Sequence, residues 1–191
     1  MVSIRWCGTF SSLSIATSRT RCVSAARNGS DMAQDVTIRP ACAEDRAALI
    51  RLMGDLNDFE AAIEDNRADA SAAESHLDWV GGQIAQLGGV TLVAELGGAV
   101  AGFLSYTFEE DPGTFVKPDY RRHALIWDIS VAEEARGRGV GQALLAAAER
   151  DVKAAGIAEI RLYVLESNIR ARRIYEQAGF RNYERFLSKR L

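Results

Sequence analysis

A short run of glycines and arginines, Arg136-Gly137-Arg138-Gly139-Val140-Gly141, is the segment best suited to binding an anion. It follows an apolar stretch and opens an alanine-rich one, which predicts a position between a strand and the start of a helix. Glycines leave backbone N–H groups accessible, and a helix N-terminus adds its partial positive charge to that of the arginines. The sequence therefore predicts a loop that holds a diphosphate.

The loop fits neither of the two common nucleotide fingerprints. No GxxxxGK[ST] string occurs anywhere in the chain, which excludes a Walker-type phosphate loop. The dinucleotide fingerprint GxGxxG fails because Leu144 stands where its third glycine is needed. A bare [QR]xxGxG string is weak evidence by itself, so its meaning depends on what surrounds it.

Those surroundings resemble the GNAT superfamily of acetyl-CoA-dependent N-acetyltransferases. The first motif is Arg136-x-x-Gly139-x-Gly141 after a strand, and the second, at the family's distance, consists of Asn168, Ala171, Tyr175 and Gly179-Phe180. The resemblance is specific over residues 124–181 and only general over residues 36–108. It implies an acyltransferase that uses acetyl-CoA as the acyl donor and needs no metal.

The resemblance also implies where acetyl-CoA binds. Strands 124–131 and 160–165 would separate, with backbone groups of Ile129 and Val131 holding the pantetheine arm. The diphosphate would be bound by the loop and the first helical turn, namely Arg136, Gly137, Arg138, Gly139, Val140, Gly141 and Gln142. Asn168 would contact the pantetheine or adenine side. Tyr175 would lie near the thioester sulfur, where a phenol can protonate the departing thiolate.

Two of these roles remain open from the residues alone. Tyr175 shares an apolar helix face with Ile174 and Ala178, so it could equally be a core aromatic. A base is needed to deprotonate the amine, and strand 124–131 offers Asp128 but no glutamate. Asp128 could equally be a structural carboxylate. His123 is a second candidate base, but it could equally be an exposed histidine in a linker. A bulge, common on this strand in the family, would decide which face Asp128 occupies.

Residues 55–78 would wall the acceptor site in this family, and they are strongly acidic. They contain eight carboxylates against the single base Arg67: Asp55, Asp58, Glu60, Glu64, Asp65, Asp69, Glu74 and Asp78. Such a wall would concentrate a cationic amine, although a solvated helix surface explains the same pattern. The aromatic residues Tyr106, Phe108 and Trp127 could line an apolar shelf or belong to the core.

Composition excludes several other classes of protein. The chain has 191 residues, of which 48% are hydrophobic and 26% charged, as in a globular domain. No apolar run is long enough to span a membrane, and three cysteines with two histidines give no metal-binding spacing. Residues 31–191 carry 19 bases and 26 acids, a net charge of −7, which argues against a nucleic-acid partner.

The first 30 residues differ from the rest, with four arginines, seven serines and no acid. We expect residues 1–33 to be a disordered leader. It is either a start codon assigned too early, because Met32 precedes the first folded-looking segment, or a segment that resembles an organellar transit peptide. Residues 34–191 are then expected to form a single GNAT-like domain, cytoplasmic unless the leader directs it to an organelle.

Hydrophobic periodicity predicts an α/β (α+β) fold. Helices are expected over 43–60, 71–87, 139–155 and 168–178, and strands over 36–39, 91–95, 100–108, 124–131, 160–165 and 180–187. This order predicts a mixed, mostly antiparallel sheet of six to seven strands flanked by about four helices.

The resemblance predicts acetyl transfer to a primary amine by direct attack in a ternary complex. The acceptor could be a small cationic amine or a protein amine, on a lysine or an N-terminus. A module that senses acyl-CoA without turnover is the alternative from another class, and a homodimer is what the family's habits imply.

Overall fold

A mixed sheet forms the centre of the computed structural model, which describes residues 36–113 and 115–191. Within these residues the sheet has five strands in the order β1-β2-β3-β4-β5. They are β1 (Thr37–Pro40), β2 (Gly89–Leu96), β3 (Ala99–Glu110), β4 (Arg122–Val131) and β5 (Ile160–Leu162). Neighbouring strands are antiparallel except β4 and β5, which run parallel.

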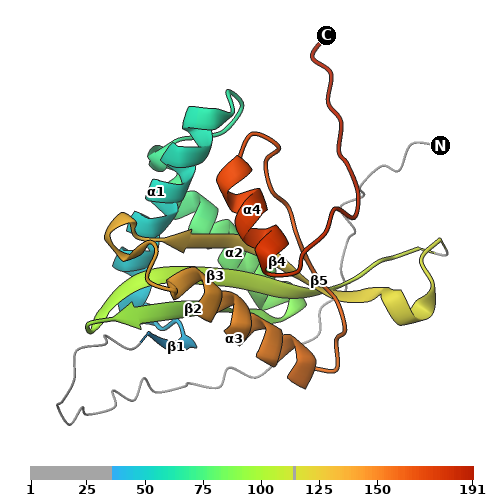
Figure 1. Cartoon of the computed structure of the whole chain (residues 1–191), viewed down its shortest axis with the longest axis horizontal. Coiled ribbons are helices and arrows are strands. Elements are labelled where there is room, and N and C mark those ends of the chain that lie inside the picture. Colours follow the sequence, from blue (N-terminus) through green and yellow to red (C-terminus); the bar gives the residue numbers. More distant parts are fainter. Residues whose placement is uncertain (1–35, 114) are drawn as a thin grey trace. The chain divides into compact units, whose positions relative to one another are not determined.

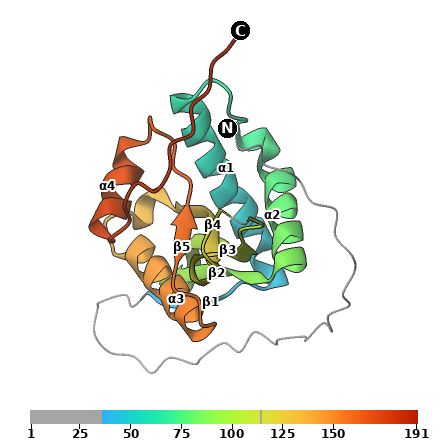
Figure 2. The same cartoon turned by 90° about the vertical axis from the view of Figure 1, so that its right-hand side faces the viewer.

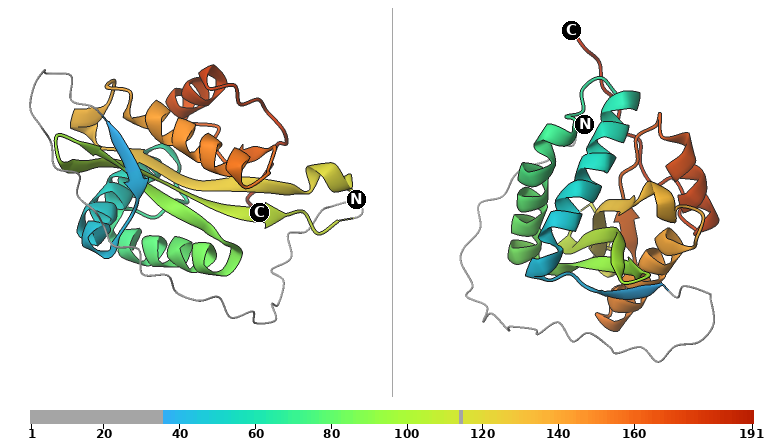
Figure 3. Two further views of the ribbon diagram at one scale, coloured as in Figure 1. Left: turned by 90° about the horizontal axis from the view of Figure 1, so that it is seen from below. Right: turned by 90° about the vertical axis from the view of Figure 1, so that its left-hand side faces the viewer.

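Helices cover both faces of this sheet (Figures 1 and 3). They are α1 (Arg46–Ile63), α2 (Ala73–Leu87), α3 (Val140–Ala154) and α4 (Ile169–Gln177). Viewed along the strands, α1 and α2 lie on one side and α3 and α4 on the other (Figure 2). The core lies in both interfaces, with Leu52 and Met53 of α1 and Leu144 of α3 fully buried against Phe103 and Leu104 of β3.

Glycines set two of the connections that the sequence predicts. Gly88 has a φ of 76° and ends α2, as expected for a helix C-terminus. Gly97 and Gly98 have φ values of 64° and 88° and join β2 to β3 in a two-residue hairpin. The predicted four helices and the hairpin are therefore confirmed, with ends that shift by a few residues.

An ion-pair cluster fixes β1 to the start of α1. The Arg39 guanidinium donates to both carboxylate oxygens of Asp45, at 2.7 and 2.9 Å, and to Glu95 at 2.7 Å. Asp45 is buried, and its hydrogen bonds from Arg39 lower the pKa of its carboxyl to about 2.

The predicted count of six to seven strands is wrong for the described residues. The segment 180–187, expected as a final strand, is irregular and leaves the sheet (Figure 1). Neither alternating set of its side chains is consistently apolar, so a strand there would bury polar groups. Tyr183 makes one contact with β5, where the Arg161 guanidinium lies 4.8 Å from its ring centroid, while Phe186 and Leu187 are exposed.

The predicted leader, residues 1–33, lies outside the described residues and stays a prediction. The described residues belong to one compact unit. None of the helices found among them has both the length and the apolar composition that crossing a membrane requires.

Gly102 of β3 allows α3 to pack closely on the sheet. A Cβ at this position would lie 2.8 Å from the Ser130 carbonyl oxygen and 3.1 Å from Cγ1 of Val140. Gly102→Ala is therefore expected to lower the free energy of unfolding by about 1–3 kcal/mol, and the melting temperature by roughly 2–10 °C. Gly82→Ala in α2, where a Cβ meets nothing within 4 Å, is the matched control and should not destabilise. Equal melting temperatures for the two variants would contradict this account.

Candidate active site

β4 and β5 pair over only three residues and then separate. The pairs run from Ala124 with Ile160 to Ile126 with Leu162, where β5 ends. β4 continues to Val131, and this part of its edge has no pairing strand among the described residues. The backbone groups along it are thus available to an extended ligand.

A bulge in β4 lies directly after the last of these pairs. β3 pairs Tyr106 with Ile126 and Ser105 with Asp128, so Trp127 is an extra residue in β4. A bulge of this kind changes which face the following side chains occupy. The bulge that the family resemblance implied is present.

Because of the bulge, the side chains of the consecutive residues Trp127 and Asp128 both lie on the face of the sheet that α1 and α2 cover. Trp127 packs edge-on against Trp79 of α2, with 4.9 Å between ring centroids. Asp128 Oδ1 lies 3.6 Å from His76 Nε2, also on α2. Ser130 Oγ donates to a carbonyl of α1 at 3.0 Å. Regular alternation would have placed Trp127 and Asp128 on opposite faces.

Asp128 is a buried carboxylate without a full set of partners. Its side chain is 8% exposed, and Oδ2 has no hydrogen-bond partner among the described residues. Burial raises the pKa of the Asp128 carboxyl to about 6. The charge of Glu60 also raises this pKa, whereas the charge of His76 lowers it. A carboxyl of this kind can take up a proton near neutral pH.

His76 and Asn57 complete this cluster, and the sequence analysis did not identify either. His76 Nδ1 lies 3.1 Å from Asn57 Oδ1, and Asn57 Nδ2 donates to the Asp69 carbonyl at 3.4 Å. A signal was present, because Asn57 follows the buried Met53 by four residues and His76 precedes the buried Val80 by four. A polar side chain on an apolar helix stripe indicates a buried polar contact.

His123, the second candidate base, lies elsewhere. It is buried near the start of β4, where Nδ1 lies 3.0 Å from the Arg121 carbonyl oxygen and Nε2 lies 3.9 Å from Glu109 Oε2. Five strand residues separate it from Asp128, roughly 17 Å. The expectation that His123 is an exposed linker residue is therefore wrong, and His123 is also not part of the Asp128 cluster.

Tyr175 lies on α4, close to the separation of the two strands. Its ring packs against Phe180 with 5.8 Å between centroids. Burial raises the pKa of the Tyr175 hydroxyl to about 12, and the charges of Glu60 and Asp128 add to this increase. The hydroxyl therefore stays protonated at neutral pH and lies near both carboxylates.

Asn168 is the N-cap of α4. Its Oδ1 accepts a hydrogen bond from the Ala171 backbone N–H at 3.0 Å, which is the usual role of this residue type at a helix start. Because the cap occupies the amide oxygen, the predicted contact with acetyl-CoA would have to come from Nδ2.

The predicted anion-binding loop precedes α3 and is exposed. Gly137 and Gly139 have φ values of 75° and 79°, a conformation that other residues rarely adopt. Gly139 is the N-cap of α3, so the first N–H groups of this helix lie beside the loop. Arg136 Nε donates to the Val131 carbonyl at 3.2 Å. In this segment Arg138 and Gln142 are exposed, Val140 is buried and Gly141 is half-buried.

The backbone of Ile129 and Val131 faces the open edge of β4. The Ala132 N–H donates to the Ala101 carbonyl of β3 at 2.9 Å. Because backbone direction alternates along a strand, Val131 and Ile129 point away from β3. This agrees with the contact between Arg136 and the Val131 carbonyl. Both residues are therefore placed as a ligand along the edge would require.

The acidic stretch 55–78 is not one wall. Arginines pair with several of these acids. Arg46 pairs with Glu74 and Asp78, Arg51 with Asp55, and Arg67 with Glu60 at 3.9 Å. Asp58 and Asp69 accept backbone hydrogen bonds at the start of the turn before α2. Glu60 raises the pKa of both Asp128 and Tyr175, and Glu64 accepts a hydrogen bond from Ser167, just before α4. The acids on the site side are thus Glu60 and Glu64.

The predicted aromatic shelf is divided between the two faces of the sheet. The Tyr106 hydroxyl donates to Asp151 of α3 at 3.4 Å, and its ring contacts Phe108. Trp127 Nε1 instead donates to Thr107 Oγ1 at 2.9 Å, on the face that α2 covers. Only Trp127 of the three therefore belongs with Asp128.

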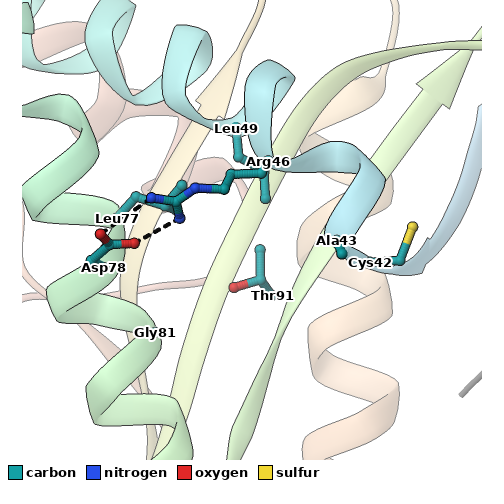
Figure 4. A pocket seen from close by; sticks show the side chains of 8 residues that line it. All are labelled: Cys42, Ala43, Arg46, Leu49, Leu77, Asp78, Gly81 and Thr91. Atoms are coloured by element: carbon teal, nitrogen blue, oxygen red, sulfur yellow. Dashed lines mark hydrogen bonds and ion pairs between the residues drawn. The ribbon is translucent and has the colours of Figure 1, made fainter. Parts of the chain in front are cut away.

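A pocket of about 450 Å³ lies at the other end of α1. Arg46 and Asp78 form an ion pair across it, and Cys42 and Thr91 lie at its edge (Figure 4). Arg46 and Asn57 are eleven helical residues apart, roughly 16 Å. The pocket is therefore separate from the Asp128 cluster. Among the described residues, no group of three His, Cys, Asp or Glu is placed to hold a metal ion.

Comparisons with known proteins show which family this chain resembles. The acetyltransferase (GNAT) family matches residues 55–180. The uncharacterized N-acetyltransferase YycN of Bacillus subtilis is 35% identical over 71 residues, 37% of this chain and 46% of YycN. A mycothiol acetyltransferase of Parafrankia is 38% identical over 65 residues, 34% of this chain and 20% of that enzyme. The chain thus spans less than half the length of these relatives.

Solved structures share the fold. A GCN5-related N-acetyltransferase from Ralstonia eutropha superposes with a TM-score of 0.64 at 25% identity, over 82% of this chain and 99% of that one. An acetyltransferase from Clostridium acetobutylicum with acetyl-CoA gives a TM-score of 0.61 at 18% identity, over 82% and 96% of the chains. With the family match covering two thirds of the sequence, the chain belongs to the GNAT acetyltransferase family.

Proposed function

We propose that the protein transfers an acetyl group from acetyl-CoA to a primary amine by direct attack in a ternary complex. The observation that carries this proposal is the place where β4 and β5 separate. Asp128, the open edge at Ile129 and Val131 and then the glycine loop follow this point along the chain, and the charge of Asp128 influences the Tyr175 hydroxyl. An anion site, an extended groove, a base and an acid are what acyl transfer from a thioester requires.

Each residue has a defined task in this proposal. Asp128 takes a proton from the ammonium group, which leaves a neutral amine that can attack the thioester carbon. The C–N bond forms as the C–S bond breaks, and Tyr175 donates its proton to the departing sulfur. The second proton of the amine nitrogen restores the phenol. Overall one proton is released for each acetyl group transferred.

A cationic amine is the acceptor that the site favours. Glu60 and Asp128 place negative charge beside Tyr175, and their field attracts a protonated amine. Trp79 is 51% exposed and packs edge-on against Trp127, so aromatic surface adjoins the carboxylates. Such a ring attracts a cation through its face. Spermidine, putrescine, lysine amide and a lysine-containing peptide form a panel that separates small amines from protein amines.

Binding of the acyl donor is tested first, because it does not depend on the acceptor. Acetyl-CoA at 100-fold over its dissociation constant should stabilise the full chain by about 2.7 kcal/mol, a rise in melting temperature of roughly 5–11 °C. Arg136→Glu should reduce this rise. No rise at millimolar acetyl-CoA would refute both the enzyme and the acyl-CoA-sensing alternative.

Gly141 gives a sharper test of the loop. Its φ lies outside the left-handed range, and a Cβ there would make only an ordinary contact, 3.8 Å from Val131 Cγ2. Nothing in the protein itself therefore requires glycine at this position. We expect Gly141→Ala to leave the melting temperature unchanged or higher, because alanine favours helix by up to about 1 kcal/mol. Acetyl-CoA affinity should fall by roughly tenfold or more, which corresponds to a loss of about 1.4 kcal/mol or more, because the added methyl group would keep the diphosphate away from the backbone N–H groups.

Gly82→Ala is again the matched control, because it adds the same methyl group to a helix away from the loop. It should raise the melting temperature slightly and leave acetyl-CoA affinity as in the wild type. Calorimetric titration of both variants measures the difference. Unchanged affinity in Gly141→Ala would show that the diphosphate does not approach this backbone.

A further inference from the structure

His76 faces Asp128 with a nitrogen whose protonation is set by its other neighbour. Asn57 Nδ2 donates to the Asp69 carbonyl, so Asn57 must turn its oxygen towards His76. An amide oxygen can only accept, and therefore His76 Nδ1 carries a hydrogen. In the neutral ring Nε2 then carries a lone pair, and this nitrogen lies 3.6 Å from Asp128 Oδ1.

Two hydrogen-bond acceptors thus face each other inside the protein. Nε2 and Oδ1 lie 3.6 Å apart, which is longer than a hydrogen bond but within the range of an ion pair once the ring carries a second proton. A proton placed there would satisfy both atoms. The other ionisable groups near Asp128 are Glu60 of α1, which is paired with Arg67 at 3.9 Å, and Tyr175 of α4.

We propose that His76 and Asp128 act as one proton-accepting pair for the acceptor amine, with Asn57 as the residue that positions the imidazole. This inference rests on the proposed acetyl transfer and adds to it the route by which the proton leaves. His76 acts through Asp128 and is a positioning and relay residue.

The route is balanced at each step. An N–H bond of the ammonium breaks and an O–H bond forms on Asp128. The proton then moves from Oδ1 to Nε2, which gives an imidazolium and restores the carboxylate. The His76 side chain is 33% exposed, whereas Asp128 is 8% exposed, so the imidazolium can release the proton to water. Imidazole is the side chain best suited to accepting and releasing protons near neutral pH.

The high proton affinity of Asp128 supports this arrangement. Burial raises the pKa of its carboxyl to about 6, so the carboxylate accepts a proton more readily than an exposed aspartate. Without a partner the proton would have no short route from a side chain that water barely reaches. His76 provides that route because it lies between Asp128 and the surface.

The kinetic test uses His76→Ala in the full chain, with acetyl-CoA and whichever amine of the panel the wild type acetylates. We expect kcat/KM to fall by roughly 10²-fold, in the range of general acid–base effects, while acetyl-CoA still raises the melting temperature as in the wild type. Added imidazole should restore part of kcat, because it can occupy the vacated position. His123→Gln is the matched control and should keep wild-type kinetics with no response to imidazole. Loss of activity without rescue would overturn the relay.

A second measurement does not need an acceptor. Nitrogen-15 NMR of labelled His76 should show the neutral ring protonated at Nδ1, and Asn57→Leu should abolish that preference. Asp128→Asn should change the Nε2 chemical shift of the His76 ring, and the ring signals of His123 should stay as in the wild type. A His76 ring protonated at Nε2, or one whose nitrogen signals do not change in Asp128→Asn, would refute the inference even if acetyl transfer is established. Absence of turnover with every amine would instead refute the proposed function, and the NMR result would still decide the pairing.

Discussion

Tyr175→Phe is expected to lower kcat by roughly 10²–10⁴-fold, the typical contribution of a general acid. The substitution removes a single oxygen from a ring that packs against Phe180, so packing and acetyl-CoA binding should be preserved. Because burial and the nearby carboxylates raise the pKa of Tyr175 to about 12, the hydroxyl is protonated throughout the working range of pH. The variant therefore loses the proton donor and little else. Thiol release from acetyl-CoA measures kcat, and the melting-temperature rise measures binding.

Tyr106→Phe is the matched control for this experiment. Burial also raises the pKa of the Tyr106 hydroxyl to about 12, but that hydroxyl contacts Asp151 of α3, on the face of the sheet opposite to Asp128. Its loss should leave kcat unchanged. If Tyr175→Phe kept both full turnover and tight binding, Tyr175 would be only a core aromatic. If neither the wild type nor the variant turned over and both bound acetyl-CoA, the sensing alternative would be favoured.

Asp128→Asn is expected to lower activity and raise stability together. The amide cannot take the ammonium proton, so kcat/KM should fall by roughly 10²-fold. In the wild type kcat/KM should rise with pH as Asp128 loses its proton around pH 6, and the variant should lack this step. An opposite movement of activity and stability is typical of a residue kept for function.

The stability effect follows from the direction of the pKa shift. The folded-state pKa of Asp128 is raised from 3.8 to about 6, so the folded protein binds the proton more tightly than the unfolded chain. This contribution is present below about pH 4 and is lost as the pH rises through 6. At pH 8 the buried charge is therefore a net cost, and Asp128→Asn should raise the free energy of unfolding by about 1–3 kcal/mol. Denaturant titration at pH 8 measures it.

Asp45→Asn provides the contrast, because Asp45 is buried to the same degree. Its pKa is lowered to about 2 by Arg39, so its contribution is present above about pH 4 and is lost as the pH falls through 2. Removing that charge should lower the free energy of unfolding by about 1–3 kcal/mol at pH 8. If both substitutions destabilised equally, Asp128 would be a structural carboxylate.

Local sequence features predicted the parts of the site that depend on neighbouring residues. The glycine loop and Tyr175 are recognisable because their spacing lies within one loop and one helix. The pairing of Asp128 with His76 was not predictable, because it depends on a bulge in β4 and on α2, about 50 residues earlier in the chain. The final strand was wrong for a related reason. Residues 180–187 have strand-forming side chains, but pairing also requires an apolar face that they lack.

The extra residue at Trp127 has a consequence for how this protein tolerates insertion and deletion. Before the bulge, the residues of β4 alternate in one phase, and after it they alternate in the opposite phase. Deleting Trp127 would restore regular alternation and leave Asp128 to Val131 opposite the same partners in β3, so their side chains would keep their faces and only the Trp127 ring would be lost. If the strand instead kept all its residues and lost the bulge, the register would shift by one, so that Asp128 and Ser130 would turn towards α3 and Ile129 and Val131 towards α1 and α2. The site therefore depends on the register of β4 against β3, and an alignment gap at Trp127 in a related sequence would indicate a strand without the bulge in which the carboxylate keeps its face.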